Sequence, residues 1–194
     1  MSPDEISGLL AFLRHAERLK TVTRTSWTSE GKQESTAEHT WRMGLFALSL
    51  KPWFPELDFE RVLALVLVHD LGEAINGDIS AVVQAGAPPK LEQERQDLRQ
   101  LLAPAPEPVR SQTLAWWEEY NAATTPEAKF VKAVDKLETI LQHNQGRNPA
   151  DFDYAFNVPY GQKFTAHHPV IVQLRAILDA ETLDRAAGNR PPPL

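Results

Sequence analysis

Apolar residues recur at three- and four-residue spacing along most of the chain, which is the pattern of helices with one buried face. Two capping boxes, Ser2-Pro3-Asp4-Glu5 and Ser35-Thr36-Ala37-Glu38, mark helix starts with a side-chain cap and an acidic residue three positions later. The pattern predicts helices over residues 3–20, 36–51, 59–71 and 90–102, around Trp116, Trp117 and Tyr120, and after Pro126 and Pro169. Their predicted core stripes include Ile6, Leu9, Leu10 and Leu13; Leu91, Leu98, Leu101 and Leu102; Phe130, Val134, Leu137 and Leu141; and Val170, Leu174, Ile177 and Leu178.

The segment 59–71 also allows a second interpretation. Its apolar run from Val62 to Val68 is rich in β-branched residues, as in a buried strand. However, Asp58 provides an N-cap and no glycine or proline interrupts the segment, so its length favours a buried helix. Residues 21–33 lack a period and are interpreted as a loop, and no strand–turn–strand pattern is found. We therefore predict an all-α fold in one domain, residues 1–187, followed by a flexible proline-rich tail, residues 188–194.

The amino-acid composition and net charge exclude several classes of protein. The 194 residues are 42% hydrophobic and carry 20 Lys+Arg against 26 Asp+Glu, a net charge of −6. This balance excludes a disordered chain and argues against a nucleic-acid coat. The N-terminus does not resemble a signal peptide and no apolar run is long enough for a membrane helix, so a cytoplasmic protein with no membrane partner is expected.

The absence of cysteine excludes disulfides, thiol catalysis and thiolate metal sites. Histidines and carboxylates are then the remaining candidates for tight metal ligands. The chain has six histidines, at positions 15, 39, 69, 143, 167 and 168.

The doublet His69-Asp70 is the most informative feature, because it ends an apolar helix where ionisable groups are costly unless paired or metal-bound. Neighbouring helical residues point about 100° apart, so the doublet can hold one ion from two directions. For the doublet taken alone, a helix-end ion pair or a core histidine bonded to a backbone carbonyl is the commoner explanation.

His39 and Asp135 strengthen the metal interpretation. His39 shares a helical stripe with Met43, Phe46 and Leu50, so it faces the core, although a lone core histidine is more often structural. Asp135 lies at the edge of an apolar stripe and Glu138 inside it, where a carboxylate needs a cation or a strong hydrogen-bond donor. Two imidazoles and two carboxylates suit a first-row divalent ion with open positions for water, and such an ion supports hydrolysis at phosphorus.

The order and spacing of His39, His69-Asp70 and Asp135 resemble the signature of HD-domain metal-dependent phosphohydrolases. Further matches are similar to the small 5′-deoxynucleotidase branch of that family and extend over about residues 10–145. They are Leu19–Thr25, Ala37–Met43, His69–Ala74, Gly77–Ile79 and Ala133–Glu138.

This resemblance implies a helical HD-type bundle that binds one divalent cation through His39, His69, Asp70 and Asp135. The metal is expected to be Co, Mn, Mg, Ni, Fe or Zn. The implied reaction is the hydrolysis of 5′-deoxyribonucleoside monophosphates to deoxynucleoside and phosphate, so the expected partner is a small nucleotide and not a nucleic acid.

The resemblance also implies catalytic roles for Glu73 and Asp78. Glu73 lies one turn beyond His69, where it can move a proton, although a solvated helix-end residue fits the same position. Asp78 follows Gly77 in a turn, where aspartate is common for local reasons. Arg24 is expected to clamp the substrate phosphate. Trp27 is a candidate for excluding ribose, and a surface-packing tryptophan explains it equally well.

Other functions stay open at this point. The chain could hydrolyse another nucleotide or phosphate ester, or bind a metal or nucleotide without catalysis. No histidine occurs between Leu71 and Val134, which argues against a two-metal phosphodiesterase. Trp116 and Trp117 fit a homodimer surface or, by the commoner pattern, a buried core.

Overall fold

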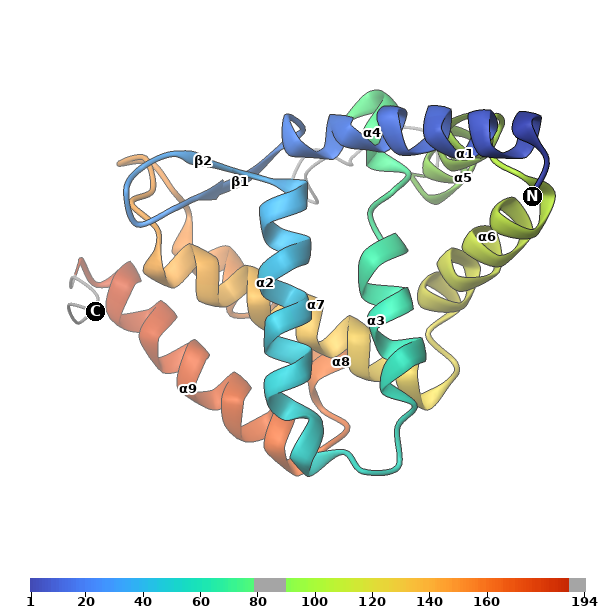
Figure 1. Cartoon of the computed structure of the whole chain (residues 1–194). Coiled ribbons are helices and arrows are strands. Elements are labelled where there is room, and N and C mark those ends of the chain that lie inside the picture. Colours follow the sequence, from blue (N-terminus) through green and yellow to red (C-terminus); the bar gives the residue numbers. More distant parts are fainter. Residues whose placement is uncertain (79–89, 189–194) are drawn as a thin grey trace.

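The computed structural model describes residues 1–78 and 90–188, and these residues are mostly helical (Figure 1). The α-helices are α1 (Pro3–Ala16), α2 (Thr36–Leu50), α3 (Phe59–Val68), α4 (Glu73–Asn76), α5 (Lys90–Leu102), α6 (Glu107–Ala122), α7 (Pro126–Gln145), α8 (Gln162–Thr165) and α9 (Pro169–Ala186). The 3₁₀ helices are η1 (Glu17–Lys20), η2 (Lys51–Trp53) and η3 (Tyr154–Asn157). One antiparallel hairpin pairs β1 (Thr23–Trp27) with β2 (Gln33–Ser35). The prediction of an all-α fold is confirmed.

The helix starts follow the sequence signals. Ser2 and Ser35 each form the complete capping box, Asp58 caps α3, and Thr125 caps α7 ahead of its first-turn proline. These caps satisfy backbone N–H groups that have no partner within the helix. The strand interpretation of Val62–Val68 is wrong, because this segment lies within α3.

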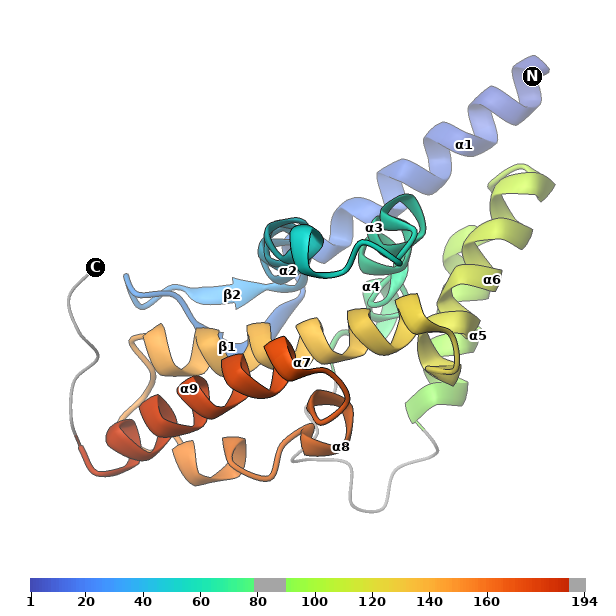
Figure 2. The ribbon, with the colours of Figure 1, turned by 90° about the horizontal axis from the view of Figure 1, so that it is seen from below.

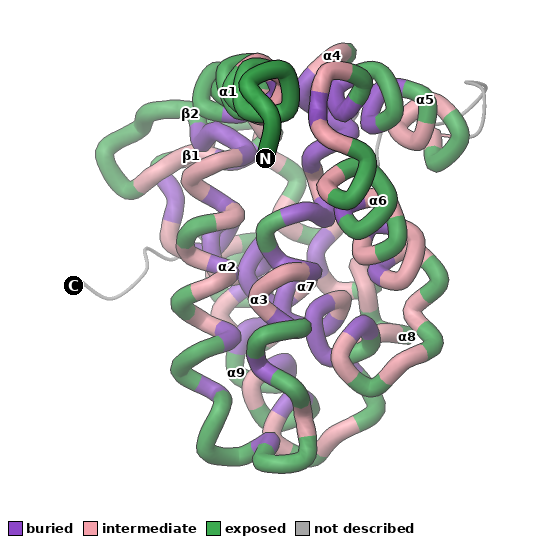
Figure 3. Tube along the Cα trace, turned by 45° about the vertical axis from the view of Figure 1, so that its right-hand side comes forward, coloured by how far each residue is buried: buried purple, intermediate pink, exposed green. Residues whose placement is uncertain are grey.

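Helix α7 lies at the centre of the molecule and packs against α2, α3, α6 and α9 (Figures 1 and 2). Its side chains join those of α2, α3 and α9 in one hydrophobic cluster. A second cluster joins α1, α5 and α6 to the end of α3. Figure 3 shows the buried positions concentrated on α2, α3 and α7. His69 and Asp70 directly follow α3, at the junction of the two clusters.

The hairpin corrects the interpretation of residues 21–33 as a loop. Pairing places Thr23 opposite Ser35 and Trp27 opposite Gln33. The buried positions of the two strands are the polar residues 26, 34 and 35. The strands therefore lack the alternation of apolar and polar residues from which a strand is predicted. The hairpin is fixed to the end of α7 and the residues after it, because the Gln142 side chain and the Arg147 backbone donate hydrogen bonds to carbonyls of residues 27 and 28.

The predicted apolar stripe of α1 is only partly buried: Leu9 packs against the second cluster, whereas Ile6, Leu10 and Leu13 are exposed. Phe12 is buried, and Gly8 lies so close to Pro104 that an added Cβ would be 2.1 Å from its carbonyl oxygen. This contact sets the buried face of α1 to one side of the predicted stripe. Five residues predicted for the core are exposed: Ile6, Leu10, Leu13, Leu91 and Ile177.

The tryptophans of α6 lie inside the protein. Trp117 is fully buried, and Trp116 is partly buried against both hydrophobic clusters. The interpretation of Trp117 as part of a dimer surface is therefore wrong. In the part of the chain that the structure describes, no helix combines the length and apolar character needed to cross a bilayer. The predicted tail, except Gly188, lies outside the described residues.

Candidate metal centre and its cavity

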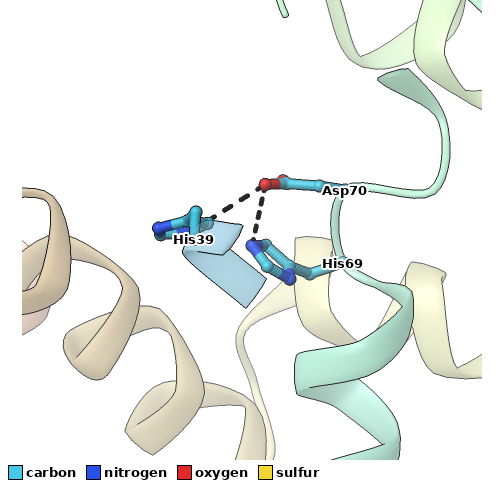
Figure 4. A group of neighbouring side chains, drawn as sticks. All are labelled: His39, His69 and Asp70. Carbon is cyan, nitrogen blue, oxygen red and sulfur yellow. Dashed lines mark ion pairs between the residues drawn. The ribbon is translucent and has the colours of Figure 1, made fainter. Parts of the chain in front are cut away.

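His39, His69 and Asp70 converge from two helices (Figure 4). His39 lies in the first turn of α2, and the other two follow the last residue of α3. The Asp70 carboxylate points toward both rings, with Oδ2 at 3.0 Å from Nε2 of His69 and 4.0 Å from Nε2 of His39. One potential ligand atom from each residue lies within 4.8 Å of the others.

The two imidazoles are oriented by their Nδ1 atoms. His39 Nδ1 contacts the Glu138 carboxylate, and His69 Nδ1 lies 2.7 Å from the backbone carbonyl of Val66. Both Nε2 atoms are buried, and among the described residues neither has a hydrogen-bond partner. A partner on Nδ1 that leaves a bare Nε2 is the arrangement of histidines that ligate metals. The donor set therefore fits a divalent cation.

Asp135 of α7 adds a second carboxylate to this cluster. Its Oδ1 lies 3.5 Å from Nε2 of His39, while Oδ2 accepts a hydrogen bond of 2.6 Å from the Tyr120 hydroxyl and lies 2.9 Å from Nζ of Lys136. Burial alone would favour the neutral acid, but Lys136 and the imidazoles hold the pKa of Asp135 well below its usual range. Asp135 thus presents a charged oxygen toward His39.

A second buried group, Glu34, His39 and Glu138, also places its ligand atoms within 4.8 Å. Two arginines already occupy these carboxylates: Arg42 Nε donates to Glu138 at 2.7 Å, and Arg24 Nε lies 3.7 Å from Glu34. Burial and the neighbouring Glu138 raise the pKa of Glu34 to about 7. This group is better suited to orienting His39 than to holding a cation.

Glu73 and Asp78 follow Asp70 in the sequence. Both line a cavity that His69, Asp70 and Asp135 also line. Glu73 is buried at the start of α4, and its Oε2 accepts a hydrogen bond of 3.2 Å from the Thr36 hydroxyl. Burial, with the charges of Asp70 and Asp78, raises the pKa of Glu73 to about 10. Lys90 Nζ lies 3.8 Å from Glu73 and 3.5 Å from Asp78.

The hairpin brings Arg24 to the cluster. Its guanidinium donates to Asp70 at 3.3 Å and to the Thr139 hydroxyl at 3.2 Å, and it lines the cavity. Trp27, at the end of the same strand, is not a lining residue. Its ring meets Phe152 edge-on, with the ring centroids 6.3 Å apart.

Described residues enclose a cavity of about 610 Å³ beside the cluster, within the size range of small-molecule sites. Sequence reasoning missed much of its wall. On α7 the lining residues recur at helical spacing, and this polar stripe on a buried helix is the signal that could have revealed them. Besides the predicted ligand Asp135, they are Lys132, Lys136, Thr139 and His143.

Cations and carboxylates share this cavity. Arg24, Lys90, Lys132 and Lys136 surround the buried acids, so the site offers oxygen and nitrogen ligands for a divalent ion next to donors for an anion. A helical fold with this pairing has the features of a metal-dependent hydrolase of phosphate esters.

Comparison with known proteins identifies the family. A model of the HD domain matches residues 16–174, and the chain belongs to this family of metal-dependent phosphohydrolases. It is 36% identical to the 5′-deoxynucleotidase HDDC2 of Homo sapiens, over 95% of this chain and 92% of that protein. It is also 36% identical to the 5′-deoxynucleotidase hdd1 of Schizosaccharomyces pombe, over 70% of each chain.

Among solved structures, the fold matches a predicted metal-dependent phosphohydrolase from Magnetospirillum magnetotacticum. The TM-score is 0.81 with 23% identity, covering 97% of this chain and all of that one. At this identity the match concerns the fold. The family and the curated relatives together make the chain an enzyme of the hydrolase class.

Proposed function

We propose that the chain is a metal-dependent phosphomonoesterase that hydrolyses 5′-deoxyribonucleoside monophosphates to deoxynucleoside and phosphate. The observation that carries this proposal is the pair of buried Nε2 atoms beside Asp70, next to a cavity that His69, Asp70 and Arg24 line. The relatives named as 5′-deoxynucleotidases, at 36% identity, support the choice of substrate.

In this proposal His39, His69, Asp70 and Asp135 hold one divalent ion. The set combines two imidazoles with two carboxylates, which first-row divalent metals accept, and Co, Mn, Mg, Ni, Fe and Zn all remain candidates. When bound, such an ion supplies Lewis acidity toward a phosphoryl oxygen and lowers the pKa of water.

The phosphate of the substrate is assigned to Arg24. Its planar guanidinium presents paired donors, and in the structure these contact Asp70 and Thr139. The nearby carboxylates keep Arg24 protonated, because they raise its pKa despite the opposing effect of burial. When Asp70 binds an ion, the Arg24 donor that contacts Asp70 in this structure can turn to the phosphate.

Proton transfer is assigned to Glu73. Its raised pKa, about 10, keeps a proton on the carboxyl at neutral pH, which suits delivery to the leaving deoxynucleoside oxygen. Asp78 shares Lys90 with Glu73 and is assigned to the same catalytic group. Because Trp27 packs against Phe152, its proposed effect on the sugar is indirect, through the strand that carries Arg24.

The test is a panel of nucleotides. The metal-loaded protein is expected to release phosphate from dAMP faster than from AMP, and Glu73→Ala, prepared with the same metal content, is the inactive control. If the protein releases no phosphate with any divalent metal, although the ion is bound, the enzymatic proposal is wrong.

The affinity for the metal is expected to fall as the pH is lowered. Burial and Arg24 lower the pKa of His39, but Glu138 and Asp135 outweigh them and raise it to about 9. A ligand histidine must be neutral, so the ion competes with a proton and releases it on binding. Titration calorimetry in buffers of different ionisation enthalpy should detect this proton near pH 7. Tight binding retained near pH 4 would contradict the ligand assignment.

Glu138→Gln is expected to weaken metal binding by about 10–100-fold, because the partner that orients His39 loses its charge. Competition with a fluorescent chelator measures the affinity. Glu118→Gln is the matched control, since Glu118 pairs with Arg95 away from the cluster. Equal affinities of the two variants would refute the role of Glu138.

A further inference from the structure

The rings of Phe156 and Tyr160 line the cavity in addition to the polar residues and to Tyr120, whose hydroxyl donates to Asp135. Their centroids lie 5.4 Å apart with an angle of 35° between the planes. Neither ring is fully buried, and Phe156 belongs to neither hydrophobic cluster of the described residues. An aromatic pair that faces a polar cavity offers apolar contact area to a flat ligand.

The backbone that carries these rings is firmly held from behind. Arg175 of α9 is buried, and its guanidinium donates hydrogen bonds to the carbonyls of Asn157, Val158 and Tyr160. Nδ1 of His143 lies 2.8 Å from the side-chain oxygen of Asn157, which is also buried. A buried arginine is costly unless its donors are satisfied, and here these three carbonyls and the Asp179 carboxylate satisfy them. The rings are therefore positioned before any ligand binds.

Tyr160 is also connected to the metal-ligand cluster. Lys136 Nζ lies 2.9 Å from Oδ2 of Asp135 and donates to the Tyr160 hydroxyl at 3.0 Å. Gly161 has φ +68°, and a Cβ there would lie 2.6 Å from Cγ of Lys136. The turn at Gly161 therefore packs directly against the aliphatic part of the Lys136 side chain. Figure 2 shows α8, which follows this turn, beside α7. One lysine thus spans from a proposed metal ligand to the aromatic pair.

We propose that Phe156 and Tyr160 form the contact surface for the nucleobase of the substrate. This inference rests on the proposed function, which places the phosphate at Arg24 and the metal. A base stacks on such rings through its π-face, which purines and pyrimidines share. The surface therefore adds affinity for a nucleotide over a sugar phosphate and discriminates little between bases.

The test compares dAMP with 2-deoxyribose 5-phosphate, which has the same phosphate and sugar without a base. Phe156→Leu is expected to lower kcat/KM for dAMP by about tenfold, mainly through KM, because one stacking contact is lost. For 2-deoxyribose 5-phosphate the change should stay within about twofold, since that ester never reaches the ring. Phe156→Tyr keeps the ring and should restore dAMP hydrolysis.

An equal loss for both esters would overturn the proposal, because it would mean that Phe156 acts only on the structure of the site. Unchanged dAMP kinetics would overturn it as well. Binding of deoxyadenosine, followed by ligand-observed NMR, does not depend on turnover. If the wild-type chain hydrolyses neither ester, the proposed function fails, and NMR decides the base contact alone: loss of binding in Phe156→Leu but not in Phe156→Tyr supports it, and equal binding refutes it.

Discussion

Asp135→Asn is expected to release the metal ion and reduce phosphate release by at least about 10²-fold. The substitution keeps the shape of the side chain but removes the charge that faces His39 at 3.5 Å. It also leaves the partly buried Lys136 without its charged partner, so the free energy of unfolding should fall by about 1.5–3 kcal/mol. Elemental analysis measures the ion, and thermal unfolding identifies the fraction of protein that remains folded.

His143→Gln is the matched control for this variant. His143 lies on the same helix and lines the same cavity, but its ring nitrogens contact Asn157 and Ser26 and not the metal-ligand cluster. The folded control should keep its ion. If Asp135→Asn retains a full complement of metal, or if both variants lose it equally, Asp135 is not a ligand.

Glu73→Gln is expected to lower kcat by about 10²–10⁴-fold while leaving metal content unchanged, because a positioned proton donor is lost. Glutamine has the shape of the protonated acid, and its side-chain oxygen can still accept the hydrogen bond from Thr36. Since the raised pKa of about 10 already makes Glu73 neutral near pH 7, the melting temperature should hardly change. Steady-state kinetics on dAMP, with metal content measured on the same sample, checks this.

Glu94→Gln is a suitable comparison for Glu73→Gln. Glu94 also lines the cavity and pairs with Lys90, at 3.3 Å, but lies on α5 away from the ligand histidines. We expect it to keep most of the activity. A Glu73→Gln enzyme that remains as active as the Glu94→Gln enzyme would remove Glu73 from the reaction.

The sequence predicted the part of the site that depends on helical periodicity. The capping box at Ser35 fixes the start of α2, and this start determines that His39 faces inward with Met43. In the same way, the cap at Thr125 starts α7 and sets the direction of Asp135. These contacts are local, so their outcome can be read from short stretches of the chain.

The hairpin and the basic residues that line the cavity could not be predicted from helical periodicity and capping. Glu34 and Ser26 are buried because they meet Arg24 and His143, not because of any local pattern. Arg24 reaches Thr139, a residue 115 positions away in the sequence. Periodicity and capping carry no information on such contacts, since these depend on how the helices pack.

Net charge also gave an incomplete picture of the site. A chain with charge −6 would repel a phosphate group at long range. In the folded protein, Arg24, Lys132 and Lys136 gather around the cavity. Local arrangement thus supplies the positive groups that the overall balance conceals.

The most direct test of the proposed activity is phosphate release from dAMP by protein first stripped with a chelator and then titrated with Co²⁺ or Mn²⁺. We expect no release by the stripped protein, and release that rises with added metal until about one ion is bound per chain. Full activity in the stripped protein, or none with the ion bound, would contradict it.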